Sequence, residues 1–235
     1  MAPAFQLPSR ARQVLLCLAA DWQAPHGQLF RCARAAGAAD WEVVGEAMPV
    51  SLGRAGLAWG RGLQPAPADG MPLKHEGDGR APAGVFALSA LFGYAAADST
   101  VARAASLPYL AATRDLKCID DPASAHYNRI VDQSAVARPD WASCEDMLRG
   151  DERYAVGAIV AHNPAPAMAG AGSCIFLHVW AAPGVPTAGC TAMALADMSA
   201  IADWLDARAA PLLVQLPRVE YERYRVAWGL PALAT

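Results

Sequence analysis

A histidine and a cysteine in the last third of the chain have the types and the order needed for covalent catalysis. His178 lies inside a short apolar run, and Cys190 follows Gly189 in a later loop of small residues. A strand, a tight loop and a return to the same sheet edge would bring the imidazole close enough to take the proton of the thiol. The two residues therefore predict a nucleophilic cysteine that forms an acyl-enzyme, with His178 as its base.

The residues around Cys190 also suggest how the reacting groups would be stabilised. A helix expected over residues 194–207 begins just beyond the cysteine, and the N-terminal end of a helix lowers the pKa of a nearby thiol. The N–H groups of Gly189 and Cys190 are the expected donors to the oxyanion that forms on an attacked carbonyl. The second ring nitrogen of His178 needs a partner, and the backbone carbonyl of Val179 is a candidate.

A more ordinary interpretation exists for each residue. A single histidine in an apolar strand is more often a buried histidine with its hydrogen bonds made, and a single cysteine after glycine more often only packs. Together with a third ligand, His178 and Cys190 could instead bind a metal. The sequence has no C-x-x-C pair or other ligand-rich spacing, so we predict neither a metal nor another cofactor.

The elements that would position these residues are mostly strands. Short apolar runs bounded by glycine or proline predict strands at residues 13–19, 28–33, 41–52, 85–88, 155–162, 174–180 and 212–216. One segment, residues 194–207, has apolar residues at clear helical spacing, with aspartates on its other faces. Many short strands and one clear helix predict a mostly β domain of the α+β class.

The chain is organised as one domain. Its 235 residues show no internal repeat and no obvious linker, so we expect a single catalytic domain over residues 1–235. Residues 100–146 have weak periodicity and several turn signals. They predict an inserted lobe over about residues 100–150, with a short helix at residues 141–148.

Composition argues against several classes of function. Hydrophobic residues make up 54% of the chain and charged residues 17%, which argues against disorder. The net charge is −3 and no basic run exceeds two residues, so we expect no nucleic-acid partner. No stretch has the length and apolarity of a membrane-spanning helix. We expect a monomer.

The N-terminal region faintly imitates an export signal. Residues 14–20 are apolar and follow Arg10 and Arg12, but Asp21 and Trp22 stand where a signal peptide would have small residues. We therefore interpret the run as a buried strand. On this interpretation the protein is cytoplasmic, or its export signal has been removed.

The six cysteines have no spacing that fixes their pairing. Cys17 and Cys32 lie in apolar runs and are expected to be small core residues. One disulfide can form among the other four, but the sequence does not say which. If Cys190 is the nucleophile, it must be free.

Three segments together resemble the L,D-transpeptidase catalytic domain, the YkuD-type fold, over roughly residues 10–216. Lys74-His-Glu-Gly-Asp-Gly-Arg-Ala-Pro-Ala-Gly-Val-Phe is similar to the Thr-Pro-x-Gly-x-Phe segment of the family, with Ala81 in place of the threonine. Residues 172–178 resemble the strand that carries the catalytic histidine, and Thr187-Ala-Gly-Cys190 resembles the Ser/Thr-x-Gly-Cys nucleophile motif. The Lys-x-Glu-Gly-Asp-Gly segment and Tyr127-Asn128-Arg129 are similar to one branch of the family.

This resemblance implies an activity and a substrate. Such enzymes attack the bond between meso-diaminopimelate and D-Ala in a tetrapeptide stem of peptidoglycan, and pass the acyl group from the cysteine to an amine. Water as the acceptor would make the protein an L,D-carboxypeptidase with the same residues. Acylation by a carbapenem and a place in the periplasm or cell envelope are further implications. A module that binds peptidoglycan without catalysis is the alternative outside the enzymes.

Two departures from the commoner family motif concern substrate binding. Ser-His-Gly-Cys is usually followed by an arginine two residues later, but this chain has Ala188 and Ala192 at the histidine and arginine positions. The missing arginine removes a clamp for a substrate carboxylate. Lys74, Arg80 and Arg129 are the candidates to replace it, although a solvated surface charge is the more ordinary interpretation of each.

Other residues are candidate contacts with the substrate. Thr187 belongs to the nucleophile motif, Trp180 ends the histidine strand, and His162 ends the strand before it. Trp180 could also be buried core, and His162 could be an ordinary histidine at a strand end. Residues 126–128 could contact the substrate or only order the lobe.

Overall fold

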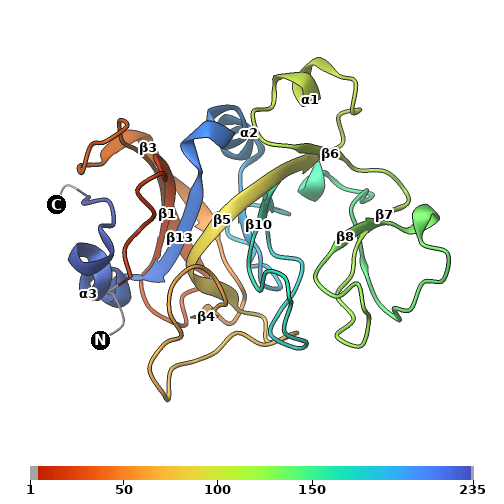
Figure 1. Cartoon of the computed structure of the whole chain (residues 1–235), viewed down its shortest axis with the longest axis horizontal. Helices are drawn as coiled ribbons and strands as arrows, with labels where there is room; N and C mark the ends of the chain where they lie inside the picture. The colour runs from red at the N-terminus through yellow and green to blue at the C-terminus, as the bar shows by residue number, and fades with distance from the viewer. Residues whose placement is uncertain (1–4, 234–235) are drawn as a thin grey trace.

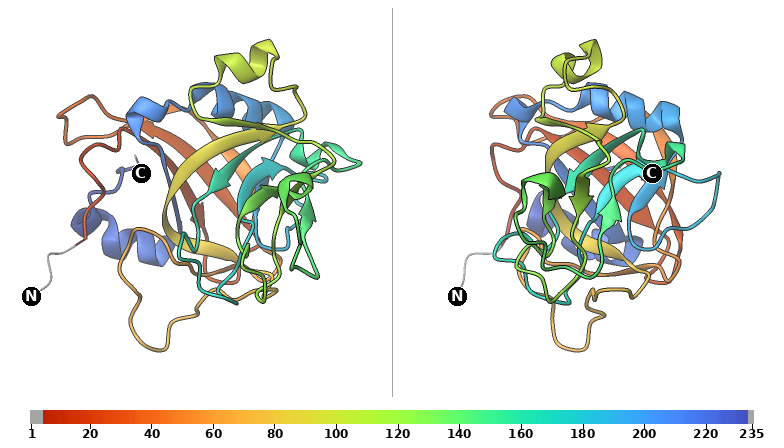
Figure 2. Two further views of the ribbon diagram at one scale, coloured as in Figure 1. Left: turned by 45° about the vertical axis from the view of Figure 1, so that its right-hand side comes forward. Right: turned by 90° about the vertical axis from the view of Figure 1, so that its right-hand side faces the viewer.

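The main sheet of the protein curls until its two edges pair, so that it closes into a barrel (Figure 1, Figure 2). A computed structural model describes residues 5–233. The strand order is β10-β11-β12-β3-β2-β1-β13-β5, and β5 pairs again with β10. These strands are β1 (Gln13–Ala19), β2 (His26–Ala33), β3 (Glu42–Ser51), β5 (Ala81–Gly93), β10 (Val156–Val160), β11 (Phe176–Val179), β12 (Thr191–Met193) and β13 (Leu212–Pro217). Two short strands, β4 (Leu57–Trp59) and β6 (Tyr109–Ala111), also pair with β5.

Helices and a small second sheet surround the barrel. Helix α2 (Leu195–Trp204) contacts β10 and β11, and α3 (Arg218–Trp228) contacts β13 and β1. The short elements are α1 (Thr100–Ala104) and the 3-10 turns η1 (Gln133–Ala135), η2 (Glu152–Tyr154) and η3 (Ala207–Ala209). Within residues 5–233, none of the helices is both long and apolar enough to cross a membrane.

The second sheet belongs to a segment that stands beside the barrel. It has the order β8-β7-β9 and consists of β7 (Leu116–Cys118), β8 (Ile130–Asp132) and β9 (Glu145–Asp146). We refer to residues 112–154, which contain this sheet, as the lobe. In Figure 1 the lobe lies on the right of the barrel, on the side away from α3.

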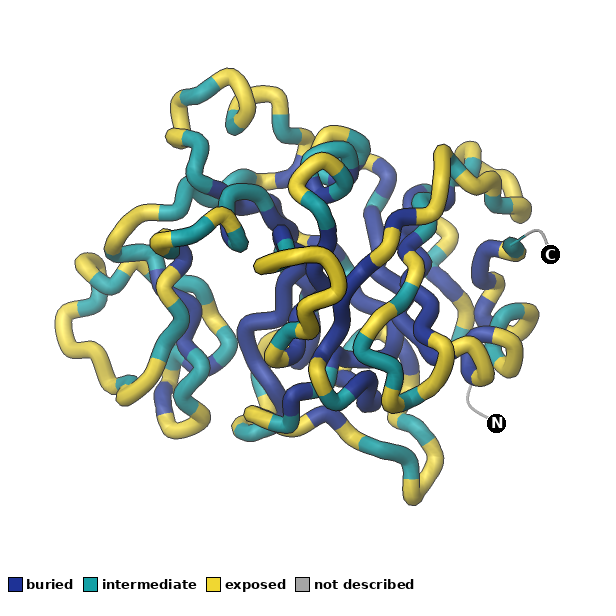
Figure 3. The backbone as a smooth tube through the Cα atoms, turned by 180° about the vertical axis from the view of Figure 1, so that it is seen from behind, coloured by how far each residue is buried: buried dark blue, intermediate teal, exposed yellow. Residues whose placement is uncertain are grey.

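The interior is filled by apolar side chains of the central strands. Every residue of β1 and β13 is buried, and buried residues are dark blue in Figure 3. Both strands lie in the middle of the sheet, paired on two sides, and both also contact α3. Nearly continuous apolar runs are typical of strands buried in this way. A second, smaller cluster of buried residues beside the lobe includes Phe92, Tyr154, Phe176 and Cys190.

One buried polar residue joins three strands. Gln215 in β13 accepts a hydrogen bond from the hydroxyl of Thr191 in β12 (2.7 Å) and donates one to the carbonyl of Pro82 in β5 (2.9 Å). The side chain has no contact with solvent. Because buried polar groups need partners, these two bonds hold the strand that follows Cys190 against the centre of the sheet.

The expected fold class, mostly β with a few helices, is confirmed, and each of the seven predicted strands has a counterpart. The predicted strand at residues 85–88 is too short, since Pro82 and Gly84 lie inside β5 rather than before it. Gly84 has a φ of 140°, and a Cβ there would stand 2.4 Å from the side chain of Gln64. The glycine therefore marks a close approach within the strand, not a turn. Strand β12 and helix α3 were not predicted.

The helix predicted at residues 141–148 is wrong. These residues contain β9, which pairs with β7 so that Glu145 stands opposite Cys118 and Asp146 opposite Lys117. The ammonium of Lys117 also bonds to the carboxylate of Asp146. Pairing with a distant segment therefore overrides a weak local helical pattern.

A disulfide ties the lobe to the barrel. Cys118 in β7 is bonded to Cys174, which stands just before β11. Cys17 and Cys32 are free and buried, as expected of core residues, and burial raises the pKa of each thiol to about 12. Cys190 is free.

Replacement of Gln215 by leucine should destabilise the barrel. The change leaves the Thr191 hydroxyl and the Pro82 carbonyl buried without this partner, and each such group costs about 1–3 kcal/mol. Urea denaturation should show a free energy of unfolding lowered by that order. Gln28→Leu alters an exposed glutamine of β2 and is the matched control, expected to stay within about 0.5 kcal/mol of wild type. An unchanged stability of Gln215→Leu would show that this amide does not hold the strands together.

Candidate active site

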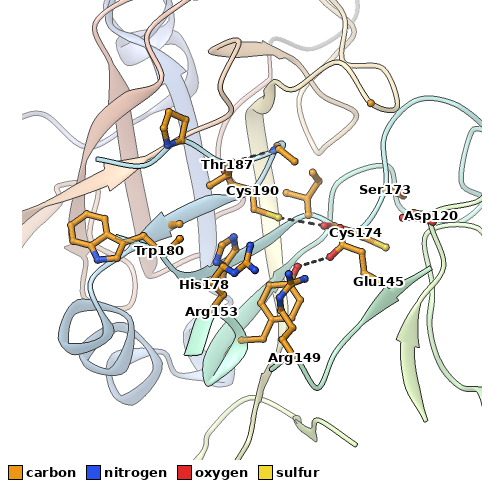
Figure 4. Close-up of a pocket in the computed structure, with 18 of the residues that line it drawn as sticks. Asp120, Glu145, Arg149, Arg153, Ser173, Cys174, His178, Trp180, Thr187 and Cys190 are labelled. Carbon is orange, nitrogen blue, oxygen red and sulfur yellow. Dashed lines mark hydrogen bonds between the residues drawn. The ribbon is translucent and has the colours of Figure 1, made fainter. Parts of the chain in front are cut away.

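One cleft at the junction of the barrel and the lobe contains both predicted catalytic residues (Figure 4). Its volume is about 450 Å³. The walls come from β11, the loop before β12, the segment around Lys74, and the lobe. Segments far apart in the sequence therefore meet around Cys190.

Cys190 stands directly before β12 and is nearly buried, with 9% of its surface exposed. Its Sγ accepts a hydrogen bond from the N–H of Phe176 (3.3 Å) and donates one to the carbonyl of Cys174 (3.5 Å). Strand β12 separates it from the N-terminal end of α2. The predicted help from a helix dipole is therefore wrong, because that effect fades within the first turn.

The pKa of the Cys190 thiol is raised, not lowered as the sequence suggested. Burial is the main cause and raises the pKa to about 12, and the nearby charge of Glu145 acts in the same direction. The N–H of Phe176 and the positive charges of Lys74 and Arg149 favour the thiolate, but less strongly. Cys190 is therefore a neutral thiol at physiological pH.

His178 lies in β11 with one ring nitrogen fixed. Nδ1 is 2.7 Å from the carbonyl oxygen of Val179, as the sequence analysis anticipated. A carbonyl oxygen can only accept, so Nδ1 carries the proton and Nε2 is left as the acceptor. The ring of Tyr154 packs edge-on to the imidazole, with 5.3 Å between ring centroids. Burial lowers the pKa of His178 to about 4, so the imidazole is neutral.

The register of the sheet places the two residues on the same side. His178 pairs with Ala192 on the neighbouring parallel strand β12. Cys190 precedes Ala192 by two residues, and residues two apart point to the same face of an extended chain. Figure 4 shows both side chains in the same cleft. Within residues 5–233 no hydrogen bond joins them, and the thiol donates instead to the carbonyl of Cys174. Because burial favours the uncharged form of each group, the two side chains are a neutral pair rather than an ion pair.

Of the two predicted oxyanion donors, one already has a hydrogen-bond partner and the other does not. The N–H of Gly189 donates to the hydroxyl of Thr187 (3.1 Å), and this hydroxyl donates to the carbonyl of Cys190 (2.6 Å). The N–H of Cys190 has no hydrogen-bond partner among residues 5–233. A Cβ at Gly189 would stand 3.2 Å from the carbonyl oxygen of Arg80, so only a glycine fits there without a shift.

The segment around Lys74 is folded on its own charges. The buried Lys74 ammonium bonds to Asp78 (2.6 Å) and to the carbonyl of His75 (2.7 Å). Asp78 also accepts the backbone N–H of Arg80 (2.8 Å). Lys74 lines the cleft, but its charge is already matched by Asp78.

Tyr127 and Asn128 of the lobe hold the chain just before β11, the strand that carries His178. Tyr127 and Ser173 both donate to one carboxylate oxygen of Glu76. Asn128 accepts the N–H of Cys174 (3.0 Å) and donates to the carbonyl of His162 (2.9 Å). Of the two roles considered for residues 126–128, these bonds support ordering.

Three of the proposed substrate contacts lie outside the cleft lining. The guanidinium of Arg80 donates to the backbone carbonyl of Leu57 (2.8 Å) and so holds a neighbouring loop. Arg129 is exposed on the lobe. His162 is buried against Phe86, bonded to a backbone carbonyl, and its pKa is lowered by burial to about 4.

The remaining predicted contacts do line the cleft. Thr187 lies in the loop beside Cys190, and Trp180 is half-buried rather than part of the core. The loop is held in place because the N–H of Thr187 donates to the carbonyl of Leu52 (2.8 Å) and the N–H of Arg54 donates to that of Thr187 (2.9 Å). Thr187 is therefore fixed by the residues that follow β3.

The sequence analysis did not predict that side chains of the lobe line the cleft. The lobe residues that line the cleft are Asp120, Glu145, Arg149, Arg153 and Tyr154. In Figure 4, Arg149 lies across the cleft from Thr187. Tyr154 donates to Glu145, and burial raises the pKa of that carboxyl. No local pattern marks these residues, since they reach the cleft only through the strand pairing of the lobe.

Barrel and cleft together define a class of protein: a mostly β domain with a histidine on one strand and a cysteine directly before the neighbouring strand. The family model of the L,D-transpeptidase catalytic domain, YkuD, matches residues 38–216, and the chain belongs to this family. Comparisons with curated proteins and with solved structures gave no match.

Alkylation of Cys190 by iodoacetamide should report its raised pKa. Free cysteine titrates near ~8.5, and only the thiolate reacts. The rate at Cys190 should therefore stay low at neutral pH and keep rising well above pH ~8.5, as followed by peptide mapping. The experiment uses Cys144→Ser, which removes the partly exposed free thiol. A midpoint below ~8.5 would instead reveal a stabilised thiolate, in conflict with the neutral pair.

Proposed function

We propose that the protein is a peptidoglycan L,D-transpeptidase in which Cys190 is the nucleophile and His178 its base. Membership of the family supports peptidoglycan stem peptides as the substrate. The observation that carries the residue assignment is the meeting of a free cysteine and a neutral histidine in one cleft. We place the activity in the cell envelope, where peptidoglycan is found.

The first step joins the donor stem to the enzyme. As Sγ of Cys190 attacks the diaminopimelate carbonyl carbon, its proton passes to Nε2 of His178 and a C–S bond forms. The carbonyl oxygen becomes an oxyanion, for which the N–H of Cys190 is an available donor. The N–H of Gly189 adds to it by exchanging the Thr187 hydroxyl for the oxyanion.

Collapse of this intermediate releases D-Ala. The C–N bond breaks, and the leaving nitrogen takes the proton from Nε2 of His178, so that a thioester on Cys190 remains. An acceptor amine then attacks the thioester and gives a proton to Nε2. The C–S bond breaks and the sulfur regains that proton. Nδ1–H stays on the carbonyl of Val179 throughout, so the imidazole does not need to turn.

Two alternatives use the same fold. If water replaces the acceptor amine, the protein is an L,D-carboxypeptidase with the same residues. If Cys190 does not react with stem peptides, the protein is a peptidoglycan-binding module. A metal site is less well supported, because within residues 5–233 no three metal-ligating side chains gather. The products made from purified muropeptides separate these possibilities.

Cys190→Ala should lower turnover of purified muropeptides by orders of magnitude, because a covalent nucleophile has no substitute. Mass spectrometry of the products supplies the measurement. Cross-linked dimers from the wild type indicate a transpeptidase, and trimmed stems alone indicate a carboxypeptidase. Cys144→Ala removes a free cysteine outside the cleft and should leave turnover unchanged. Turnover by Cys190→Ala within tenfold of wild type would contradict the assignment.

The pH dependence of kcat/KM should reflect the lowered pKa of His178. The base must be neutral to accept the thiol proton, and burial lowers its pKa to about 4. Activity should therefore persist as the pH falls through ~6.5, where an ordinary histidine becomes charged, and be lost only near pH 4. A fall in kcat/KM centred near ~6.5 would mean that His178 is not held neutral by burial.

A further inference from the structure

The strand after Cys190 supplies no cation to the cleft. The position where the commoner family motif has an arginine is Ala192, which is fully buried and paired with His178. Lys74, the nearest alternative suggested by the sequence, is already bound to Asp78. A carboxylate on the substrate must therefore find its partner on another wall.

The lobe places two guanidinium groups on that wall, and they differ in what they already bind. Arg153 donates from Nε and Nη2 to one oxygen of Asp151 (2.9 and 2.5 Å). The Arg149 side chain makes no hydrogen bond to any of residues 5–233, and its nearest anionic contact is Asp151 at 3.6 Å. Arg149 thus has the unused donors.

Arg149 and His178 both pack against the ring of Tyr154. The guanidinium carbon of Arg149 lies 5.1 Å from the centroid of the Tyr154 ring, and that ring packs edge-on to His178. An arginine stacked on an aromatic ring presents its planar set of donors in a fixed direction. This geometry suits a carboxylate, which a guanidinium can bind with two parallel hydrogen bonds.

Two acidic side chains line the same cleft as Arg149. Glu145 accepts the Tyr154 hydroxyl at one oxygen, and Asp120 accepts the Ser143 hydroxyl at one oxygen. Among residues 5–233, the second oxygen of each carboxylate has no hydrogen-bond donor. One wall therefore offers both a cation and anions, which is complementary to a group that carries a carboxylate and an ammonium together.

We propose that this wall binds the zwitterionic amino-acid group at the end of the diaminopimelate side chain, with Arg149 on its carboxylate and Glu145 and Asp120 on its ammonium. The inference rests on the function proposed above. The D-Ala of the donor stem also has a carboxylate, but its nitrogen is acylated, so it carries no ammonium. Arg149 is thereby a specificity-determining residue of the donor site.

The test compares donor stems that differ only at this group. Wild type and Arg149→Ala are assayed with a diaminopimelate stem, with the same stem amidated on the side-chain carboxylate, and with a lysine stem that lacks this carboxylate. The wild type should show a KM about tenfold to a hundredfold lower for the first stem, the range of a hydrogen bond to a charged group. Arg149→Ala should have the same KM for all three stems, because the variant no longer distinguishes a free carboxylate from an amide or from a missing carboxylate.

Two controls separate this role from a structural one. Arg138→Ala removes an exposed arginine elsewhere in the lobe and should keep the preference of the wild type. Arg149→Lys keeps the charge but loses the planar pair of donors, so it should recover only part of the preference. A general folding defect would lower kcat on every stem instead.

The proposal is overturned if Arg149→Ala keeps the preference for the free carboxylate. A fourth stem, which ends in D-alaninamide and so lacks the carboxylate of the leaving group, is assayed as well. The proposal is also overturned if Arg149→Ala changes only the KM difference between this stem and the unmodified stem, because Arg149 would then bind the leaving group. Equal use of all three stems by the wild type would refute the donor-site assignment while leaving the transpeptidase function intact. Turnover of none of them by the wild type would refute both.

Discussion

The parallel pairing of β11 with β12 is the constraint on which the cleft depends. Parallel neighbours usually need a crossover of a dozen or more residues, commonly a helix, whereas here only a Gly- and Pro-containing loop connects them. That loop is pinned to the sheet, since Thr187 bonds to Leu52 and the carbonyl of Gly184 lies 2.8 Å from Nε2 of His26. A slip of one residue in this register would turn the side chains of β12 to the opposite face.

Burial then sets the chemistry of the pair. It disfavours the charged form of each group, so it raises the pKa of the Cys190 thiol and lowers that of the His178 imidazole. The cysteine and the histidine are consequently both neutral at rest, and in the mechanism proposed above they become charged only as the substrate reacts. Fixed donors and the held tautomer of His178 can stabilise that charge without rearrangement, which is how preorganised sites favour a transition state.

The lobe is part of the site rather than a decoration on the barrel. Its disulfide, Cys118 to Cys174, and the bonds of Asn128 reach the residues just before β11. Its other end contributes Tyr154, which packs on His178. The segment that approaches the histidine strand is thus held by the same lobe that lines the opposite wall of the cleft.

The sequence by itself indicated seven of the strands, the class of fold and the two residues that we propose to react, because apolar periodicity and the Gly-Cys motif are local properties of the chain. It also anticipated the bond from His178 to the carbonyl of Val179. Tertiary structure decided the protonation state of Cys190, because desolvation depends on what packs around the thiol and outweighs the local motif. It likewise decided that Arg149 and Glu145 face the cleft while Arg80 does not. Those residues are brought to the site by strand pairing and a disulfide between distant segments, which no local pattern encodes.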